Sequence, residues 1–526
     1  MKKIIALFIV LIYIGNINAQ ELESFTRLQS AGPIPDFFVK FFDEKISEDS
    51  EKLKKEEGIT RKNASEFSVL TNYKLQQLIQ GGKVLYGDPL TNYANGVLDK
   101  LKAASEDDLD HIQLYTLKSN EVNAFATHQG VIFITVGLIG QLENEAQLAL
   151  ILAHELTHVL KKHSQLSYQY SQELIKKSRY GDGTISDFYQ YSRENEEEAD
   201  EAGFKLALKA GYNADELYTT FRVLLYSYLP IDEQPLDYSQ WENKSYTIAG
   251  KYQMDDGRVN KISAEEDIND AFLTHPNIAT RRKNARALVQ GSDHLADSKT
   301  YIFGTPERFE KLRTLARFEM LNTFIQRADY VKGLYHSMIM RKLYPKNTFV
   351  INSQAMIWHG IAAYEARAND IPYSFSYREI EGEIQHLYFF LNKLKTDEIT
   401  MLATQQIWQN SLAYPENQFL QQIRKEVLRD FVSYKENKLG NFASRHREQA
   451  DTSVIIKKKD AVLNKYDKIA KKRKNKASEA PFYYALIGIV DNPLFQKEVA
   501  NAEDILQDKE KIEEQIAEKN KKPQKN

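Results

Sequence analysis

The residues best suited to chemistry form the pentapeptide His154-Glu155-Leu156-Thr157-His158. On a helix, positions four apart are offset by about 40°, so both histidines project from one face and can bind the same metal ion. Neutral imidazoles suit zinc, which in catalytic sites keeps one coordination position open for water. Glu155 would lie about a quarter turn away, where its carboxylate can reach that water as a general base. The pentapeptide therefore predicts metal-assisted hydrolysis.

A zinc site of this kind needs a third protein ligand. His163 stands five residues after His158, about 140° round the same helix, so we expect it to point away from the pair. The acidic cluster 194–201 is the better source, and most of its members are expected on a solvated face. Glu196 and Asp200 are four residues apart and share a face, so one can bind the metal while the other orients a ligand histidine. Their spacing alone leaves open which does which.

Hydrophobic periodicity predicts the elements that position these residues. The pentapeptide lies in an apolar segment, 144–163, which predicts a largely buried helix. Before it, the alternating stretch 111–118 and the β-branched run 131–136 predict strands of a small sheet. The acidic cluster lies in a second helical pattern, 192–210, followed by Gly211 as a C-cap. The polar stretch 228–272 has no clear period and is expected to form a loop or lid.

Composition bounds the remaining functions. The chain has 526 residues, 42% of them hydrophobic and 27% charged, which is typical of a globular protein with several domains. Seventy Lys and Arg against 73 Asp and Glu give a net charge of -3, so we expect no nucleic-acid partner. The chain contains no cysteine, which excludes disulfides, thiolate metal sites and a cysteine nucleophile.

The N-terminus has the outline of a secretory signal peptide. Lys2 and Lys3 precede an apolar run, 4–14, and the small residue Ala19 stands before Gln20. This run is shorter than the roughly 18 apolar residues that usually span a bilayer. We therefore expect residues 1–19 to be removed, and the mature chain to be periplasmic and without a transmembrane span.

The C-terminal half is helical in pattern and contains one internal similarity. The segment Tyr344-Pro345-Lys346-Asn347-Thr348-Phe349 matches 414–419 at Tyr, Pro, Asn and Phe. The offset between the two prolines, 415 minus 345, is 70 residues, close to two tetratricopeptide periods of about 34. We expect a tetratricopeptide-like region over 299–440 and a helical extension over 441–500; an irregular helical domain is the alternative. The charged residues 501–526 are expected to form a frayed helix or a disordered tail.

Several separated motifs together resemble a known family. In order, they are Asn123-Ala124-Phe125-Ala126-Thr127, Gly137-Leu138, the pentapeptide, and Ser192-Arg193 with Glu196, Ala199-Asp200 and Gly203. The stretch from about Thr91 to Ala287 closely resembles the HtpX/BepA-like zinc metallopeptidases, gluzincin relatives of the CAAX prenyl protease. The absence of transmembrane segments makes the chain more similar to the periplasmic, BepA-like branch.

The resemblance implies a fold and a set of site residues. The expected fold is α+β: a helical lead-in over 20–88, then a mostly helical gluzincin domain with a small sheet over 89–298. It implies one Zn²⁺ per chain, with Glu196 as the third ligand and Asp200 supporting a ligand histidine. It also implies that His275, in Thr274-His275-Pro276, lies over the metal with Arg281 and stabilises the oxyanion.

The resemblance also implies a function. We expect a zinc endopeptidase that hydrolyses unfolded or misassembled envelope proteins. Substrate would add a strand along the sheet edge from Asn123 to Val136. The helical region would contact outer-membrane assembly proteins and hold the enzyme near that membrane. The alternative is a periplasmic chaperone or assembly scaffold with a latent metal site.

Overall fold

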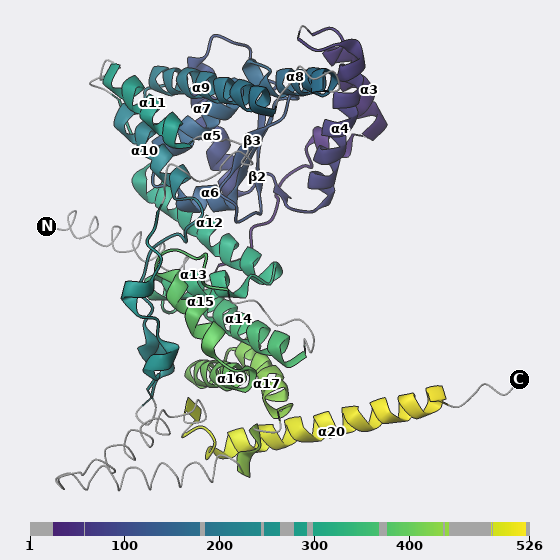
Figure 1. Cartoon of the computed structure of the whole chain (residues 1–526), viewed down its shortest axis with the longest axis vertical. Helices are drawn as coiled ribbons and strands as arrows, with labels where there is room; N and C mark the ends of the chain where they lie inside the picture. Colours follow the sequence, from purple (N-terminus) through teal and green to yellow (C-terminus); the bar gives the residue numbers. More distant parts are fainter. Residues whose placement is uncertain are drawn as a thin grey trace, which may run out of the picture. The chain divides into compact units, whose positions relative to one another are not determined.

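The computed structural model describes residues 25–40, 42–56, 58–178, 185–243, 247–263, 278–291, 298–367, 376–434, 437–440, 485–486 and 488–521 (Figure 1). The chain divides into two compact units. The sheet-containing unit comprises residues 26–231 and 263–323, and the helical unit comprises 1–25, 232–262 and 324–526. The expected signal peptide and most of the expected extension 441–500 lie outside the described residues.

A four-stranded sheet forms one part of the sheet-containing unit, in agreement with the predicted α+β class. The strands are β1 (Val84–Leu85), β2 (Gln113–Leu117), β3 (Ala124–Ala126) and β4 (Val131–Thr135), in the spatial order β1-β2-β4-β3. β2 and β4 are parallel, whereas β1 and β3 pair antiparallel to their neighbours. Every residue of β4 is buried, as its unbroken β-branched sequence predicts. β3 is an edge strand.

Helices surround this sheet. They are α2 (Asp36–Val39), α3 (Phe42–Leu53), α4 (Arg61–Gln80), α5 (Pro89–Ala104), α6 (Val136–Gln141), α7 (Glu145–Leu160), α8 (His163–Ser178), α9 (Ile185–Lys209), α10 (Ala214–Leu225), α11 (Ile278–Gly291) and α12 (Pro306–Gln326). α7 is the central helix and packs against α5, α9, α10 and the sheet. Asn144 caps it by accepting from the backbone N–H of Gln147 at 3.0 Å. The predicted buried helix is thus confirmed.

The sheet-containing unit continues past residue 298, the expected end of the metallopeptidase domain, and buried Glu145 shows why. Its carboxylate accepts hydrogen bonds from five donors: the hydroxyls of Tyr93 and Tyr212 and the backbone N–H groups of Ile302, Phe303 and Gly304. A buried carboxylate is stable only when its oxygens are satisfied in this way. Residues 299–304 are therefore part of the same core, and the unit ends at 323.

The helical unit contains α13 (Tyr330–Leu343), α14 (Thr348–Arg367), α15 (Ile384–Lys393), α16 (Thr396–Ala413), α17 (Gln418–Val432) and α20 (Pro493–Lys521). The two similar segments form matching turns. Tyr344 and Tyr414 both end a helix at φ -129°, with ψ of 66° and 69°. Asn347 and Asn417 then cap α14 and α17, accepting from the N–H three residues on. The internal similarity therefore encodes a helix–turn–helix joint; a tetratricopeptide fold stays a prediction.

The expected loop or lid, 228–272, belongs to the helical unit over its described residues 232–243 and 247–262. Trp241 stacks on Phe390 with ring centroids 4.5 Å apart. The hydroxyl of Tyr252 donates to Glu398 at 2.8 Å. Short 3-10 turns, Tyr238–Trp241, Gly250–Tyr252 and Asp256–Arg258, replace regular structure. This segment has no helical period because its aromatic residues fill gaps between helices, and these residues do not form a free lid.

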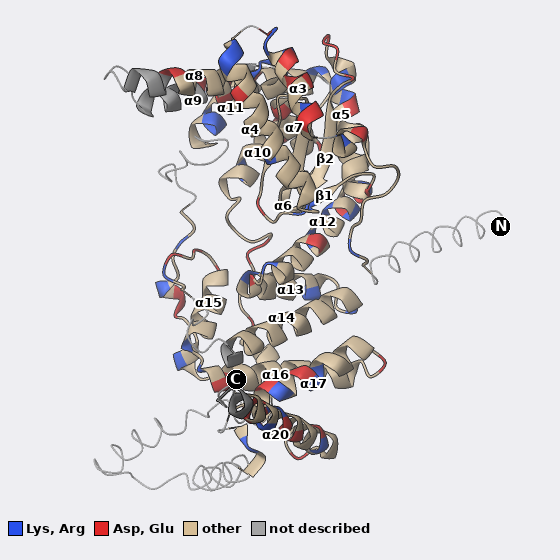
Figure 2. Cartoon of the chain, turned by 90° about the vertical axis from the view of Figure 1, so that its right-hand side faces the viewer, with Lys and Arg blue, Asp and Glu red and all other residues tan. Residues whose placement is uncertain are grey.

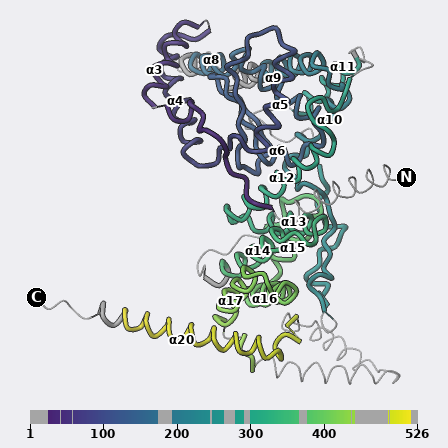
Figure 3. Tube along the Cα trace, turned by 180° about the vertical axis from the view of Figure 1, so that it is seen from behind, coloured from purple at the N-terminus to yellow at the C-terminus, as the bar shows by residue number. Residues whose placement is uncertain are grey.

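Of the two alternatives expected for the tail, a frayed helix or disorder, its described part forms a helix. α20 continues to Lys521 (Figure 3). Both signs of charge lie along it (Figure 2), and Lys509 stands 3.6 Å from Glu513, one turn further on. Such pairs stabilise a helix that is rich in charged residues. Its first turns are anchored by Arg424, which donates to both carboxylate oxygens of Glu498. Among the described helices, none has the length and apolarity needed to cross a bilayer.

Candidate metal centre

Two histidines on α7 face each other as the pentapeptide predicts. His154 Nε2 and His158 Nε2 lie 2.9 Å apart. His154 is buried, and His158 is partly buried. The helix is held rigidly here because nearly all of its residues are in the core. The two ring nitrogens therefore have little freedom to move apart.

Glu196 on α9 completes a group of three possible ligand atoms. Its carboxylate oxygens lie 3.4 Å from the Nε2 atoms of both His154 and His158. Within the described residues, these three side chains are the group whose geometry could hold a metal ion. Gly203 lets α9 approach this closely, because a Cβ there would lie 2.9 Å from the backbone nitrogen of His154.

Asp200 stands one turn further along α9 and contacts the other side of His154. Its Oδ1 lies 2.9 Å from His154 Nδ1. The two acidic residues that spacing could not distinguish therefore face different nitrogens. Glu196 faces the ring nitrogens that converge, whereas Asp200 faces the nitrogen that a metal-binding histidine uses to anchor its ring.

Arg281 on α11 holds both acidic residues. Its Nε and Nη2 donate hydrogen bonds of 2.7 Å to the two carboxylate oxygens of Asp200. Its Nη1 lies 2.9 Å from Glu196. The side chain is 4% exposed. Arg281 therefore orients the carboxylates, and its expected contact with an oxyanion stays a prediction. His275, the other expected electrophile, lies outside the described residues.

Neighbouring groups set the protonation of the site. Burial would raise the pKa of Asp200, but Arg281 and His154 outweigh burial and hold that pKa at about 2. Burial would lower the pKa of His154, yet hydrogen bonds to Asp200 and Glu196 raise it above the ordinary value. Burial prevails at His158 and lowers its pKa to about 4. The ring of His158 is thus neutral at pH 7 and offers a lone pair.

Glu155 is buried beside the ligand group, with 2% of its surface exposed. Its charge raises the pKa of both His158 and Arg281, which places it electrostatically close to the site. It is not one of the three converging side chains. Its expected role as a general base stays a prediction.

His163 does not point away, which corrects the sequence expectation. Its Nδ1 lies 2.8 Å from Nδ1 of His158. The expectation assumed one continuous helix, but α7 ends at Leu160 and Lys162 adopts the left-handed conformation with φ of 56°. The chain reverses direction there, and His163 begins α8 facing back toward the site. Lys161 and Lys162, cations typical of a final helical turn, were the available signal for this end.

Glu198 was also missed, because it was assigned to a solvated face. Its carboxylate is half-exposed, but one oxygen lies 3.2 Å from His163 Nε2. The other lies 2.7 Å from Lys161 Nζ. The contacts with Lys161 and His163 hold the pKa of the Glu198 carboxyl below its ordinary value. Burial of the His163 ring outweighs the contact with Glu198 and lowers the pKa of His163. No sequence pattern indicated this pairing.

The donor set fits a zinc ion. Tetrahedral zinc with ligand distances of about 2.0–2.1 Å separates its donor atoms by about 3.3 Å. The observed separations among His154, His158 and Glu196 are 2.9, 3.4 and 3.4 Å. Two lone-pair nitrogens that face each other would repel unless a cation or proton lay between them. Nitrogen and carboxylate ligands in this number are those of a catalytic zinc site.

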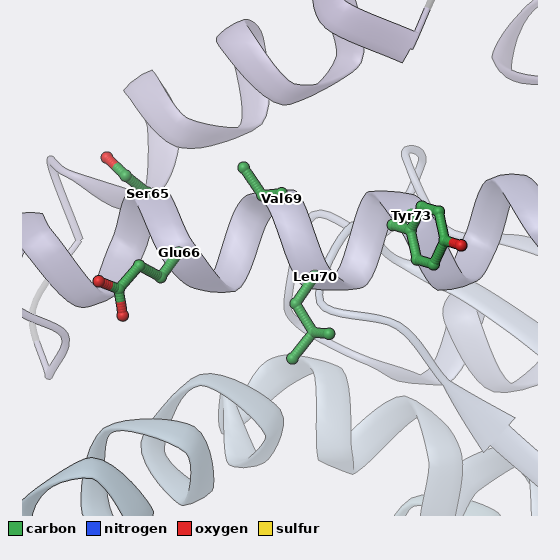
Figure 4. A pocket seen from close by; sticks show the side chains of 5 residues that line it. All are labelled: Ser65, Glu66, Val69, Leu70 and Tyr73. Carbon is green, nitrogen blue, oxygen red and sulfur yellow. The ribbon is translucent and has the colours of Figure 1, made fainter.

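A second surface feature lies on α4. Val69, Leu70 and Tyr73 are exposed and, with Ser65 and Glu66, line an open hollow (Figure 4). These five side chains include one titratable acid and no histidine. The hollow is therefore not a candidate for hydrolytic chemistry.

Comparison with known proteins agrees with this geometry. Residues 91–289 match peptidase family M48. The beta-barrel assembly-enhancing protease of Yersinia pestis is 24% identical over 165 residues, 27% of this chain and 34% of that protein. The protease of the same name from Escherichia coli strain K12 is 25% identical over 178 residues, 29% of this chain and 36% of that protein. The matched part thus spans about a third of these relatives. Residues 91–289 thus match peptidase family M48, and the similarity to these two proteases supports an HtpX/BepA-like metallopeptidase domain in this part of the chain.

Proposed function

We propose that the chain is a zinc-dependent endopeptidase in which His154, His158 and Glu196 hold one Zn²⁺. The observation that carries this proposal is the convergence of two Nε2 atoms and a carboxylate within 2.9–3.4 Å of one another. Each remaining nitrogen of the two rings has a partner that anchors the ring. Such anchored rings are typical of functional metal sites.

In this proposal, Glu155 is the general base. Bound zinc lowers the pKa of a water molecule and polarises the peptide carbonyl. Glu155 accepts a proton from the attacking water and then delivers it to the nitrogen of the leaving amine. Asp200 keeps the proton of His154 on Nδ1, and Arg281 keeps Asp200 ionised and in place. Burial of these groups excludes competing water and strengthens their interactions.

The proposed oxyanion contacts come from His275 and Arg281 and rest on the family resemblance. Arg281 has three nitrogens directed at carboxylates. Its contribution to an oxyanion is therefore the weaker of the two. His275 is proposed as the main protein group for this step.

Substrate is proposed to add a strand to β3, which is an edge of the sheet. Thr127 donates its N–H to Val131, and Thr135 donates its N–H to the carbonyl of Asn123. In an antiparallel pair, hydrogen-bonded positions alternate. The N–H and C=O of Ala126 therefore lie on the side of β3 away from β4. Pairing through these groups would accept many sequences.

The cellular role is proposed from the N-terminal sequence and the relatives. We propose export to the periplasm, because residues 1–19 have the pattern of a signal peptide. Two relatives are named beta-barrel assembly-enhancing proteases. By analogy, the substrates would be unfolded or misassembled envelope proteins, and the helical unit would bind outer-membrane assembly proteins near that membrane.

The test combines metal analysis with proteolysis of casein by the full-length protein. Wild type should contain about one zinc per chain and cleave casein. Glu155→Gln should retain zinc and lose turnover by at least about 10²-fold, the contribution of a general base. Glu196→Ala should lose both zinc and turnover, whereas Glu201→Ala, an exposed acid on the same helix, should change neither.

Two outcomes would contradict the proposal. Full zinc occupancy in Glu196→Ala would remove Glu196 as a ligand. Zinc binding by a wild type without any peptidase activity on casein or on unfolded envelope proteins would instead support the chaperone or scaffold with a latent site.

A further inference from the structure

We propose that His163 is a positioning residue for the ligand His158, and that Glu198 in turn fixes the ring of His163. This inference rests on the proposed zinc site. It gives His163 and Glu198 a role in the site, although helical spacing predicted that His163 points away from it and that Glu198 lies on a solvated face. The evidence is the geometry of the joint between α7 and α8.

The joint places the two rings together by reversing the chain. α7 ends at Leu160, Lys162 takes φ of 56°, and α8 starts with His163. Left-handed geometry is disfavoured for a residue with a long side chain, by roughly 1–2 kcal/mol. The surrounding structure therefore holds a conformation that brings His163 Nδ1 to 2.8 Å from His158 Nδ1. The ring of His163 is 4% exposed.

The proton positions follow from the neighbours of each nitrogen. Nε2 of His158 faces Glu196 and the Nε2 of His154, so it must carry the lone pair for the metal. A neutral imidazole has one N–H, which for His158 is then at Nδ1 and points at His163. Nδ1 of His163 must accept that hydrogen bond. The N–H of His163 is therefore at Nε2.

Glu198 selects this tautomer of His163. Its carboxylate lies 3.2 Å from His163 Nε2, and a carboxylate accepts hydrogen bonds without donating one. Lys161 Nζ, at 2.7 Å, holds the carboxylate ionised and in place. A directed series thus runs from Glu198 through His163 to His158. The two ligand histidines are supported differently: His154 by a carboxylate and His158 by a second imidazole.

A substitution series separates this role from simple packing. His163→Leu removes the acceptor and leaves the N–H of His158 without a partner at this position. His163→Asn retains an acceptor, because the Asn carbonyl oxygen is bonded to Cγ as Nδ1 is in histidine. Zinc affinity, measured on full-length protein by competition with a chromogenic chelator, should fall about 10- to 100-fold in His163→Leu. His163→Asn should restore most of that loss, and the exposed-histidine control His111→Leu should match wild type.

Glu198→Ala provides a second test that does not disturb the core, because this side chain is half-exposed. It should lower zinc affinity less than His163→Leu does. The decrease should disappear in the His163→Leu background, since Glu198 acts through the ring. The Co²⁺-substituted protein offers an independent readout, because its visible spectrum reports ligand geometry: His163→Leu should shift it, and His163→Asn should return it toward wild type.

The outcomes distinguish this inference from the proposed function. Equal zinc affinity in wild type, His163→Leu and Glu198→Ala would overturn the positioning role and leave the zinc site intact. A loss in His163→Leu that His163→Asn does not reduce, with no effect of Glu198→Ala, would show a packing role only. A wild type that binds no zinc would overturn both. If circular dichroism shows that His163→Leu does not fold, the zinc affinities of Glu198→Ala and of the double variant Glu198→Ala/His163→Asn decide whether His163 has the positioning role.

Discussion

Arg281 and Asp200 form a buried, two-pronged ion pair that joins α11 to α9 across 81 residues of sequence. The guanidinium of Arg281 donates to both carboxylate oxygens of Asp200 at 2.7 Å and also contacts Glu196. Two carboxylates thus share one buried cation. Since Glu196 is a proposed ligand, this pair links the stability of the site to its chemistry.

Removing the cation should strongly destabilise the metal-free protein. Arg281→Met leaves two buried carboxylates without their counter-charge, and breaking such a pair costs about 3–5 kcal/mol in the free energy of unfolding. The cost should be smaller when Asp200→Asn is already present, which a double-mutant cycle in urea measures. Arg282→Met is the matched control, because the guanidinium of Arg282 lies over the ring of Tyr218. Equal losses for both arginines would contradict this reading.

Zinc binding should release about one proton between pH 5 and 6. A ligand histidine must be neutral to bind zinc. The pKa of His154 is raised above the ordinary value of histidine, so this ring is protonated between pH 5 and 6 and must lose a proton when zinc binds. The pKa of His158 is about 4, so this ring is already neutral. Zinc affinity should therefore fall about tenfold for each unit that the pH falls in this range. Calorimetry in two buffers counts the protons, and a count of two would show that both rings start charged.

Two glutamates near the start of α7 should differ sharply in their effect on stability. Glu145→Ala leaves two buried hydroxyls and three partly buried N–H groups without their acceptor and should lower the free energy of unfolding by about 3 kcal/mol or more. Glu143 forms an exposed ion pair with Arg222, which is worth less than about 1 kcal/mol. Glu143→Ala is therefore the control. Chemical denaturation of both variants tests the difference, and similar midpoints would refute the role of Glu145 as a core anchor.

The position of β3 at the edge of the sheet offers a test of the substrate proposal. Proline at Ala126 removes an N–H that faces away from β4, where edge strands tolerate proline. Ala126→Pro should keep the fold and lower kcat/KM on an unstructured peptide about three- to tenfold, the worth of one hydrogen bond. Thr127→Pro removes the N–H that bonds Val131 and should instead destabilise the β3–β4 pair. An unchanged kcat/KM in folded Ala126→Pro would exclude strand addition through this group.

Local patterns in the sequence determined the elements and the first two candidate ligands. Histidines four apart on a helix face one direction whatever surrounds them, so His154 and His158 could be paired before any fold was known. The β-branched run gave β4, and each Tyr-Pro segment encoded a helix end and a cap within a few residues. These features depend on neighbours in the chain, which is why periodicity and turn chemistry predict them.

Only the tertiary structure decided which distant groups meet. Glu196 and Asp200 share a helix face, and the position of α9 against α7, permitted by Gly203, determines which of them faces Nε2. One left-handed residue, Lys162, turns His163 toward the site, although helical spacing directs it away. Periodicity reports the direction of a side chain within its own element. Contacts across tens of residues depend instead on how elements pack and where the backbone turns, and a short window of sequence does not contain that information.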